Sequence, residues 1–186
     1  HVVGLKLYRN NLTGAIPDGI SALSHLKSLN LAFNVIEGEL PKDLFSLQKL
    51  SSLRLEMNKI SGTLPQDFSK MAALEELSMF NNLFQGEIPE GIGEISNLKT
   101  LNLSSNYLEG SLPKSLEKLE KLERLELFGN KLAGAIEVDL GRLVNLREII
   151  LSYNKFEGDL PSGMATLSNL EFVQLQGNDF RSLNSL

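Results

Sequence analysis

A motif returns every 24 residues along this chain, and that spacing constrains the fold more than any other feature. Asparagine fills one position of the motif eight times, and the register holds without an insertion or a deletion. The asparagines are Asn10, Asn34, Asn58, Asn82, Asn106, Asn130, Asn154 and Asn178. A fixed period of this length indicates a solenoid, in which each repeat forms one turn of a coil and shares its core with its neighbours.

Glycine and proline mark two further positions of the motif. A glycine follows the asparagine by four residues in seven repeats, and Ser182 replaces it in the eighth. All six prolines share one position, and Glu137 interrupts their series between Pro113 and Pro161. Glycine permits sharp turns, while proline fixes its own φ and extends the residue before it. Together they predict a tight turn and a short second strand on the flank of the coil.

The apolar residues of the motif predict the local structure. In residues 26–41, LKSLNLAFNVIEGELP, Leu29 and Leu31 alternate with polar residues, and this period of two predicts a β-strand. Successive strands run in the same direction, so they form a parallel sheet. On the return path, apolar residues such as Ile20 and Leu23 are three apart, which predicts short helical turns.

The unit LxxLxLxxNxLxGxIP resembles the 24-residue leucine-rich repeat of the plant type, and the GxIP or GxLP ending carries that resemblance. The resemblance covers the whole chain in eight copies, of which the first and last are incomplete. It implies an α/β solenoid, a right-handed plant-type superhelix with a parallel sheet on its concave face. Short 3-10 helices and short second strands are implied elsewhere. Similar repeats form the ectodomains of leucine-rich-repeat receptor-like kinases and receptor-like proteins.

The asparagine series is interpreted as a structural ladder. A buried amide without partners costs about 1–3 kcal/mol, so a series of asparagines on the inside of a coil requires a regular set of hydrogen bonds. We expect these side chains to satisfy the backbone groups of the turn after each strand, and not to contact a ligand.

Composition limits the partners. The net charge is −5 with no basic cluster, which argues against nucleic acid. No apolar run approaches the roughly 20 residues that span a bilayer. The unbroken register predicts one domain over residues 1–186. Cysteine is absent, whereas the ectodomains that this chain resembles usually carry cysteine-paired caps. We therefore expect a longer chain, or a neighbouring domain or subunit, to cover the ends, where an uncapped solenoid exposes apolar edges.

The sequence shows no sign of catalysis. The only histidines are His1 and His25, and the chain lacks a cysteine nucleophile, a metal-ligand cluster and a phosphate-binding glycine loop. Solvated surface charge explains carboxylates such as Glu75 and Glu76. The chain is predicted not to be an enzyme and to need no cofactor or metal.

The outward-facing strand positions are free of the repeat's rules, so unusual residues there indicate a partner site. Phe128, Ile150 and Phe172 fall on three successive predicted strands and form a diagonal apolar track. Apolar patches rimmed by charge often mark protein interfaces, although scattered surface aromatics are also ordinary. The candidate partner-binding residues are Tyr8, Arg54, Glu56, Phe80, Glu126, Phe128, Ile150 and Phe172.

One recognition mode of the similar receptors does not match this chain. Peptide-sensing members use two arginines on one inner strand to hold a peptide carboxylate. Here Arg54 is followed by Glu56 at the matching position, and Lys6 by Tyr8. The arginine pair is missing, so we do not expect that mode.

Two triplets match the N-glycosylation acceptor pattern. They begin at Asn11 and Asn102, although such triplets also arise by chance in repeats rich in asparagine and serine. Their use depends on passage through the secretory pathway. A sugar on Asn102 is expected to obstruct the middle of the concave face.

The sequence thus predicts protein or peptide recognition through the concave face, as part of an extracellular or cell-surface receptor-like protein. Two alternatives stay open. One is a structural repeat subunit or scaffold module within a larger intracellular or organellar assembly. The other is a secreted inhibitor of a wall-degrading enzyme.

Overall fold

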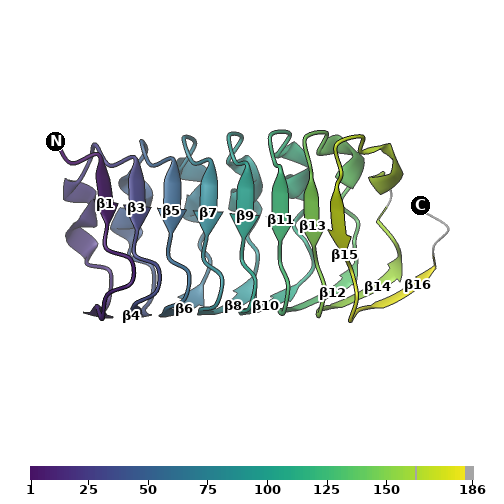
Figure 1. The fold of residues 1–186 in the computed structure, drawn as a ribbon, viewed down its shortest axis with the longest axis horizontal. Coiled ribbons are helices and arrows are strands. Elements are labelled where there is room, and N and C mark those ends of the chain that lie inside the picture. Colours follow the sequence, from purple (N-terminus) through teal and green to yellow (C-terminus); the bar gives the residue numbers. More distant parts are fainter. Residues whose placement is uncertain (162, 183–186) are drawn as a thin grey trace.

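Two parallel sheets form two sides of one long coil. The structure is a computed structural model that describes residues 1–161 and 163–182. Each sheet has eight strands, and each strand pairs with the corresponding strands of the repeats before and after it. Figure 1 shows the coils in sequence order from the N-terminus to the C-terminus, with one sheet in front, the helices behind it and the second strands along the lower edge. The predicted leucine-rich repeat solenoid is confirmed.

The front sheet, here called the major sheet, uses the alternating leucines. Neighbouring strands pair in parallel, 24 residues apart, as in Leu29 with Leu53. The central residue is completely buried in all strands from β3 to β13, so one face of the sheet belongs to the core. The strands are β1 (Gly4–Lys6), β3 (Ser28–Asn30), β5 (Ser52–Arg54), β7 (Glu76–Ser78), β9 (Thr100–Asn102), β11 (Arg124–Glu126), β13 (Glu148–Ile150) and β15 (Phe172–Gln174).

The minor sheet contains the glycines of the motif, and it confirms the predicted second strands. Gly110 has φ +76°, and a Cβ there would lie 2.9 Å from Cγ of Glu87 in the preceding repeat. Both the backbone angle and the close approach therefore favour glycine. The strands are β2 (Thr13–Gly14), β4 (Val35–Gly38), β6 (Lys59–Thr63), β8 (Leu83–Glu87), β10 (Tyr107–Gly110), β12 (Lys131–Ala135), β14 (Lys155–Asp159) and β16 (Asp179–Ser182).

Short 3-10 helices close each turn of the coil behind the major sheet. Proline precedes each of the first five helices, where its missing N–H and fixed φ suit a helix start. Where Glu137 replaces proline, η6 begins later and Asp139 caps it by accepting from the amide of Gly141. The helices are η1 (Asp18–Ala22), η2 (Lys42–Ser46), η3 (Gln66–Lys70), η4 (Glu90–Glu94), η5 (Lys114–Lys118), η6 (Leu140–Arg142) and η7 (Met164–Thr166).

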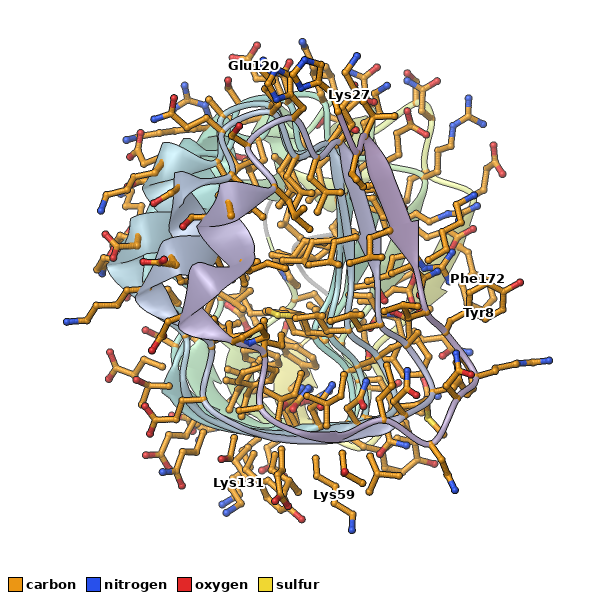
Figure 2. All side chains as sticks on the ribbon, turned by 90° about the vertical axis from the view of Figure 1, so that its left-hand side faces the viewer. Tyr8, Lys27, Lys59, Glu120, Lys131 and Phe172 are labelled. Atoms are coloured by element: carbon orange, nitrogen blue, oxygen red, sulfur yellow. The ribbon has the colours of Figure 1, made fainter. Side chains whose placement is uncertain are left out.

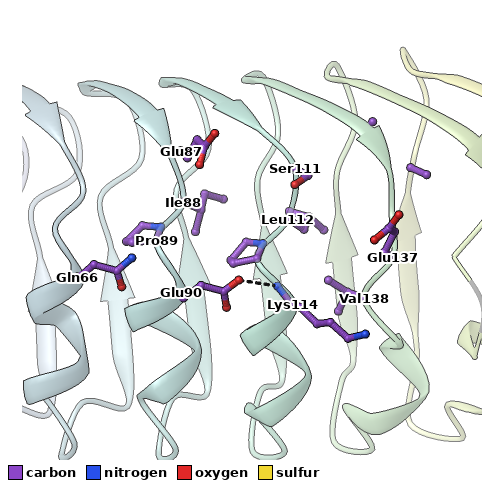
Figure 3. A pocket seen from close by; sticks show the side chains of 13 residues that line it. Gln66, Glu87, Ile88, Pro89, Glu90, Ser111, Leu112, Lys114, Glu137 and Val138 are labelled. Atoms are coloured by element: carbon purple, nitrogen blue, oxygen red, sulfur yellow. Dashed lines mark hydrogen bonds between the residues drawn. The ribbon is translucent and has the colours of Figure 1, made fainter.

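Side chains of one repeat cap the helix of the next. The amide of Gly91 at the start of η4 donates to Gln66 Oε1 at 2.7 Å. At the start of η5, the amide of Lys114 donates to Glu90 Oε1 at 3.3 Å (Figure 3), and the amide of Ser115 donates to Glu90 Oε2 at 2.9 Å. Because proline at the N-cap offers no side-chain acceptor, these borrowed caps satisfy helix-start amides that would otherwise need water.

The asparagines link adjacent coils through their side chains. Asn106 Nδ2 donates to the carbonyl of Leu103 in its own turn and to that of Met79 in the preceding repeat, both at 3.1 Å. Its Oδ1 accepts from the amide of Phe84, also in the preceding repeat. The same pattern recurs from Asn34 to Asn178, so each of these asparagines holds the turn of one repeat against the turn of the previous one.

Candidate binding face of the major sheet

The outer face of the major sheet presents four positions per repeat. They are the first and last residues of each strand and the second and third residues beyond it. The strand register aligns these positions in four rows along the coil. Figure 2 shows Tyr8 and Phe172, from opposite ends of the chain, projecting from this face on the side away from the helices.

The last of these rows adopts a left-handed backbone in every repeat. Six of its members are not glycine, among them Phe33 and Tyr153, with φ of 56° and 55°. Glycine occupies the same row at Gly129 and Gly177, where it meets the backbone demand without strain. Phe33 and Tyr153 are exposed aromatics at positions where glycine would avoid backbone strain. Their presence there indicates that the side chains have a role on the surface, such as contact with a partner.

Four residues near the C-terminal end form an aromatic patch, defined here as Phe128, Ile150, Tyr153 and Phe172. The rings of Phe128 and Tyr153 meet edge-on, with centroids 5.5 Å apart and planes at 82°. Phe128, Tyr153 and Phe172 are 38%, 58% and 45% exposed, and Ile150 is half-buried. Sequence reasoning identified three of these residues and missed Tyr153, because its row carries no alternating pattern.

A buried hydroxyl lies in the same repeat as Tyr153. Ser152 is completely buried, and its Oγ has no hydrogen-bond partner within the described residues. Its row also contains Phe128, one repeat earlier. Beneath the outer face near the aromatic patch, the Ser152 hydroxyl therefore forms no hydrogen bond with the described residues.

A set of charged residues borders the aromatic patch. Arg124 Nε lies 3.5 Å from Glu148 Oε1, and Glu126 Oε2 accepts from Asn102 Nδ2 at 2.7 Å. Burial raises the pKa of Glu126, the nearby charge of Glu148 raises it further, and Arg124 opposes them. The charged form of this half-buried carboxylate is therefore disfavoured at the centre of the face.

The two glycosylation triplets differ in accessibility. Asn11 is exposed in the turn between β1 and β2. Asn102 is half-buried, and besides its bond to Glu126 its Oδ1 accepts from the amide of Ser104. Attachment at Asn102 would disturb contacts within the face, whereas attachment at Asn11 would not.

A hollow of about 510 Å³ opens at the other end of the face, over β1, β3 and β5, and is here called the N-terminal hollow. Tyr8 and Phe33 are among its walls, and Ala32 is buried in its floor. Arg54 and Glu56 form its far side. Phe80, the remaining aromatic candidate, is half-buried on the repeat that follows Glu56.

Glu56 is buried, contrary to the exposed position that its place in the repeat led us to expect. Arg54 bends over it, and its Nε and Nη2 donate to Glu56 Oε1 at 3.1 and 2.8 Å. The side chain of Glu56 is only 1% exposed as a result. The hydrogen bond from Arg54 to Glu56 raises the pKa of the arginine, so the guanidinium stays charged.

A second hollow, of about 460 Å³, lies on the flank between the minor sheet and the helices (Figure 3). Glu87, Glu90 and Glu137 contribute carboxylates to its lining, together with Lys114. The carboxylate of Glu90 is already occupied by the amides at the start of η5. This hollow is therefore explained by helix capping between repeats.

Two further features bear on the class of site. Each helix in the described residues has only three to five residues, which is far too short to cross a bilayer. Within the described part of the chain, no three His, Asp or Glu side chains gather closely enough to hold a metal ion.

The family model described as a leucine-rich repeat region matches residues 4–182, so this chain belongs to the leucine-rich repeat family. No curated protein matches the sequence. The chain is of the plant type and is similar to receptor kinase ectodomains of plants.

The solved structures that resemble it include several plant receptors. A TDR receptor aligns over 96% of this chain and 31% of its own, with 35% identity and a TM-score of 0.94. The ectodomain of GASSHO1/SCHENGEN3 from Arabidopsis thaliana, in complex with CASPARIAN STRIP INTEGRITY FACTOR 2, aligns over 94% and 21%, with 38% identity and a TM-score of 0.91. The Arabidopsis HAESA ectodomain, in complex with an extended IDA peptide hormone, aligns over 95% and 30%, with 34% identity and a TM-score of 0.91. The chain spans less than a third of each.

Proposed function

We propose that this chain recognises a protein or peptide partner through the outer face of its major sheet, as part of a receptor-like protein. The observation that carries the proposal is the aromatic patch. Phe128, Tyr153 and Phe172 all keep a large exposed fraction on one face, and none is needed to fill the core. Aromatic anchors contribute a large share of the binding free energy at protein interfaces.

The size of the patch suits a short extended segment. Neighbouring strands lie about 4.8 Å apart, so β11 and β15 are separated by roughly 10 Å, the length of about three extended residues. Burial of one apolar side chain of the partner contributes about 1.5–3 kcal/mol. The charges of Arg124, Glu126 and Glu148 beside the patch supply the polar rim that limits which segments bind.

The solved structures support the kind of partner. The HAESA and GASSHO1/SCHENGEN3 ectodomains were solved with a peptide hormone and with CASPARIAN STRIP INTEGRITY FACTOR 2, respectively. At 34–38% identity over nearly the whole of this chain, the scaffold is shared. The contacts that choose a ligand lie in the outward rows, which differ from repeat to repeat within this chain.

The experiment is selection of binding peptides from a displayed random library, followed by affinity measurement on variants. Phe128→Ser with Phe172→Ser should abolish binding of the selected peptides without unfolding the protein. The matched control is Tyr107→Ser, which removes an aromatic of at least similar exposure from the minor sheet. Peptides that bind the double variant unchanged, or that lose affinity equally with the control, would refute the proposal.

We further propose an extracellular location, in line with the receptor ectodomains that this chain resembles. Flanking segments or a neighbouring domain would cover the terminal coils. The test is intact mass of the protein from its native source, before and after glycosidase treatment. A mass loss that maps to Asn11 is expected, and an unglycosylated chain isolated from the cell interior would argue against this location.

A further inference from the structure

The N-terminal hollow is electrostatically distinct from the rest of the chain. Three cationic side chains line it, Lys6, Arg9 and Arg54, against the two carboxylates of Glu56 and Glu76. The chain as a whole carries a net charge of −5. A local excess of positive charge in a concave site attracts anionic groups, and the effect is strongest at low ionic strength.

Arg54 is held in a fixed orientation inside this hollow. Its Nε and Nη2 are bound by one oxygen of the buried Glu56, and its Nε also lies 3.7 Å from Glu76 Oε1. Glu76 is itself fixed, since its Oε2 accepts from Ser52 Oγ at 2.8 Å. The side chain of Arg54 is nevertheless 44% exposed. Its Nη1 donors are therefore available to a ligand without reorganisation of the site.

Two more cations stand beside Arg54 without a carboxylate partner in the described residues. Lys6 forms no ion pair there, and Arg9 instead lies over the ring of Phe33, with its Cζ 5.3 Å from the ring centroid. Tyr8 adds a second exposed aromatic surface on the same wall. The hollow thus combines unused positive charge with flat apolar walls.

We propose that the N-terminal hollow binds an acidic peptide segment, with a carboxylate on Arg54 and Lys6 and an adjacent apolar side chain against Tyr8 and Phe33. Glu56 is the positioning residue that holds Arg54 for this contact. The inference deepens the proposed function, because it names the chemistry accepted by a second part of the same face.

The walls of the hollow favour a peptide over a bare anion. Tyr8 and Phe33 give an apolar peptide side chain a contact that phosphate or sulfate does not use.

The test uses two blocked tripeptides, acetyl-Asp-Phe-Asp-amide and its uncharged counterpart acetyl-Asn-Phe-Asn-amide. Affinity is measured by calorimetry, and the site is located by backbone amide shifts in NMR spectra. The acidic peptide should bind about tenfold more tightly than the uncharged one, as expected for charge-assisted hydrogen bonds. The largest shifts should fall on Asn30 and Ala32. Equal affinities, or shifts confined to other strands, would overturn the assignment.

Variants identify the residues. Lys6→Gln and Arg54→Gln should each lower the preference for the acidic peptide, and Glu56→Gln should lower it with the arginine still present. Lys155→Gln and Arg181→Gln, on the minor sheet, are the matched controls and should leave it unchanged. If Arg54→Gln unfolds the protein by leaving Glu56 unpaired, the double variant Arg54→Gln with Glu56→Gln removes both charges and gives the same test. An unchanged preference in the Lys6 and double variants would refute the proposal.

The last part of the test is competition between inorganic phosphate and the acidic tripeptide. Phosphate that displaces the acidic tripeptide at a comparable concentration would show a site for simple anions and overturn the peptide assignment. The Phe128→Ser variant separates this proposal from the proposed function. It should leave the tripeptide affinity intact, so failure of the aromatic patch and failure of the hollow give different results.

Discussion

The rings of Phe128 and Tyr153 come from consecutive repeats and meet edge-on at 5.5 Å between centroids. Phe128 is the second residue beyond strand β11. Tyr153 lies in the left-handed row and has φ 55°. The contact therefore joins two rows as well as two repeats. It assembles part of the aromatic patch before any partner arrives, which reduces the ordering that binding requires.

This ring contact should be measurable as a coupling free energy. Phe128→Ala and Tyr153→Ala are expected to be less destabilising together than the sum of their separate effects, with a coupling of about 0.5–1.5 kcal/mol for an edge-to-face pair. Denaturant unfolding of the four proteins in the cycle measures it. The control cycle pairs Phe128→Ala with Tyr107→Ala on the minor sheet, and it should be additive. Additivity in the Tyr153 cycle as well would contradict the contact.

The asparagine series should differ in importance between the middle and the end of the coil. Asn106 is buried and bonded to its own turn and to the preceding repeat, so Asn106→Ala leaves carbonyls of Leu103 and Met79 and the amide of Phe84 without this partner. A loss of about 2–4 kcal/mol is expected from the unsatisfied groups. Asn10→Ala is the control, because Asn10 is exposed and bonds only within its own turn through its side chain. A similar shift of the unfolding midpoint in both variants would contradict the ladder.

Two glycines at the same place in the repeat have opposite surroundings. A Cβ on Gly91 would lie 2.2 Å from the carbonyl oxygen of Gln66, whereas a Cβ on Gly19 would meet nothing within 4 Å. Gly91→Ala should therefore force η3 and η4 apart and lower stability by about 2 kcal/mol or more. Gly19→Ala should be neutral or slightly stabilising, because alanine restricts the unfolded chain. Thermal unfolding of both variants decides, and equal melting temperatures would show that the coil adapts.

The architecture was predictable because the repeat constrains it at every level. The alternation of Leu29 and Leu31 predicted the major sheet, and the spacing of Ile20 and Leu23 predicted the helical turns. Gly110 marks a position in the minor sheet where the backbone angle and the close neighbour favour glycine. Each of these features depends on backbone geometry and burial that recur in every coil. A regular sequence pattern is sufficient to infer them.

The candidate site was less predictable because it depends on side chains that do not repeat. The burial of Glu56 follows from the conformation of Arg54, and alternation gives only the side of the sheet on which Glu56 lies. Tyr153 was missed because its left-handed position is shared by residues as different as Arg9 and Met57, which have no common chemistry to signal it. The proposed partners of these residues remain predictions.

The cap that Glu90 provides to η5 should depend on pH. The hydroxyl and amide of Ser115 lower the pKa of Glu90, with smaller help from Lys114 and Lys118. A carboxyl with a lowered folded-state pKa stabilises the protein above its unfolded-state pKa, and that stabilisation is lost as the pH falls through the folded-state value. Glu90→Ala should cost about 1 kcal/mol at pH 7, as for other helix caps, and less below pH 4. Unfolding at both pH values tests this, and a constant difference would contradict it.

Glu126 should show the opposite dependence on pH. Burial and Glu148 raise its pKa, so between the unfolded-state and folded-state values the folded protein binds more protons than the unfolded chain. Stability that the neutral form provides is present in acid and is lost as the pH rises through the folded-state pKa. Glu126→Gln keeps an oxygen that accepts from Asn102 Nδ2 but removes the charge. The variant should therefore be more stable than the unmodified protein at pH 7, by less than about 1 kcal/mol because the site keeps some solvent, and should match it in acid.

The control for this change is Glu109→Gln, which removes an exposed carboxylate from the minor sheet and should have little effect at either pH. Denaturant unfolding across the acid range distinguishes the two variants. If Glu126→Gln destabilises the protein at pH 7, the charged carboxylate must be engaged favourably, and Asn102 rather than burial would then dominate the behaviour of Glu126. If its advantage grows as the pH rises, the centre of this face carries an unfavourable charge that a cationic group of a partner would relieve on binding.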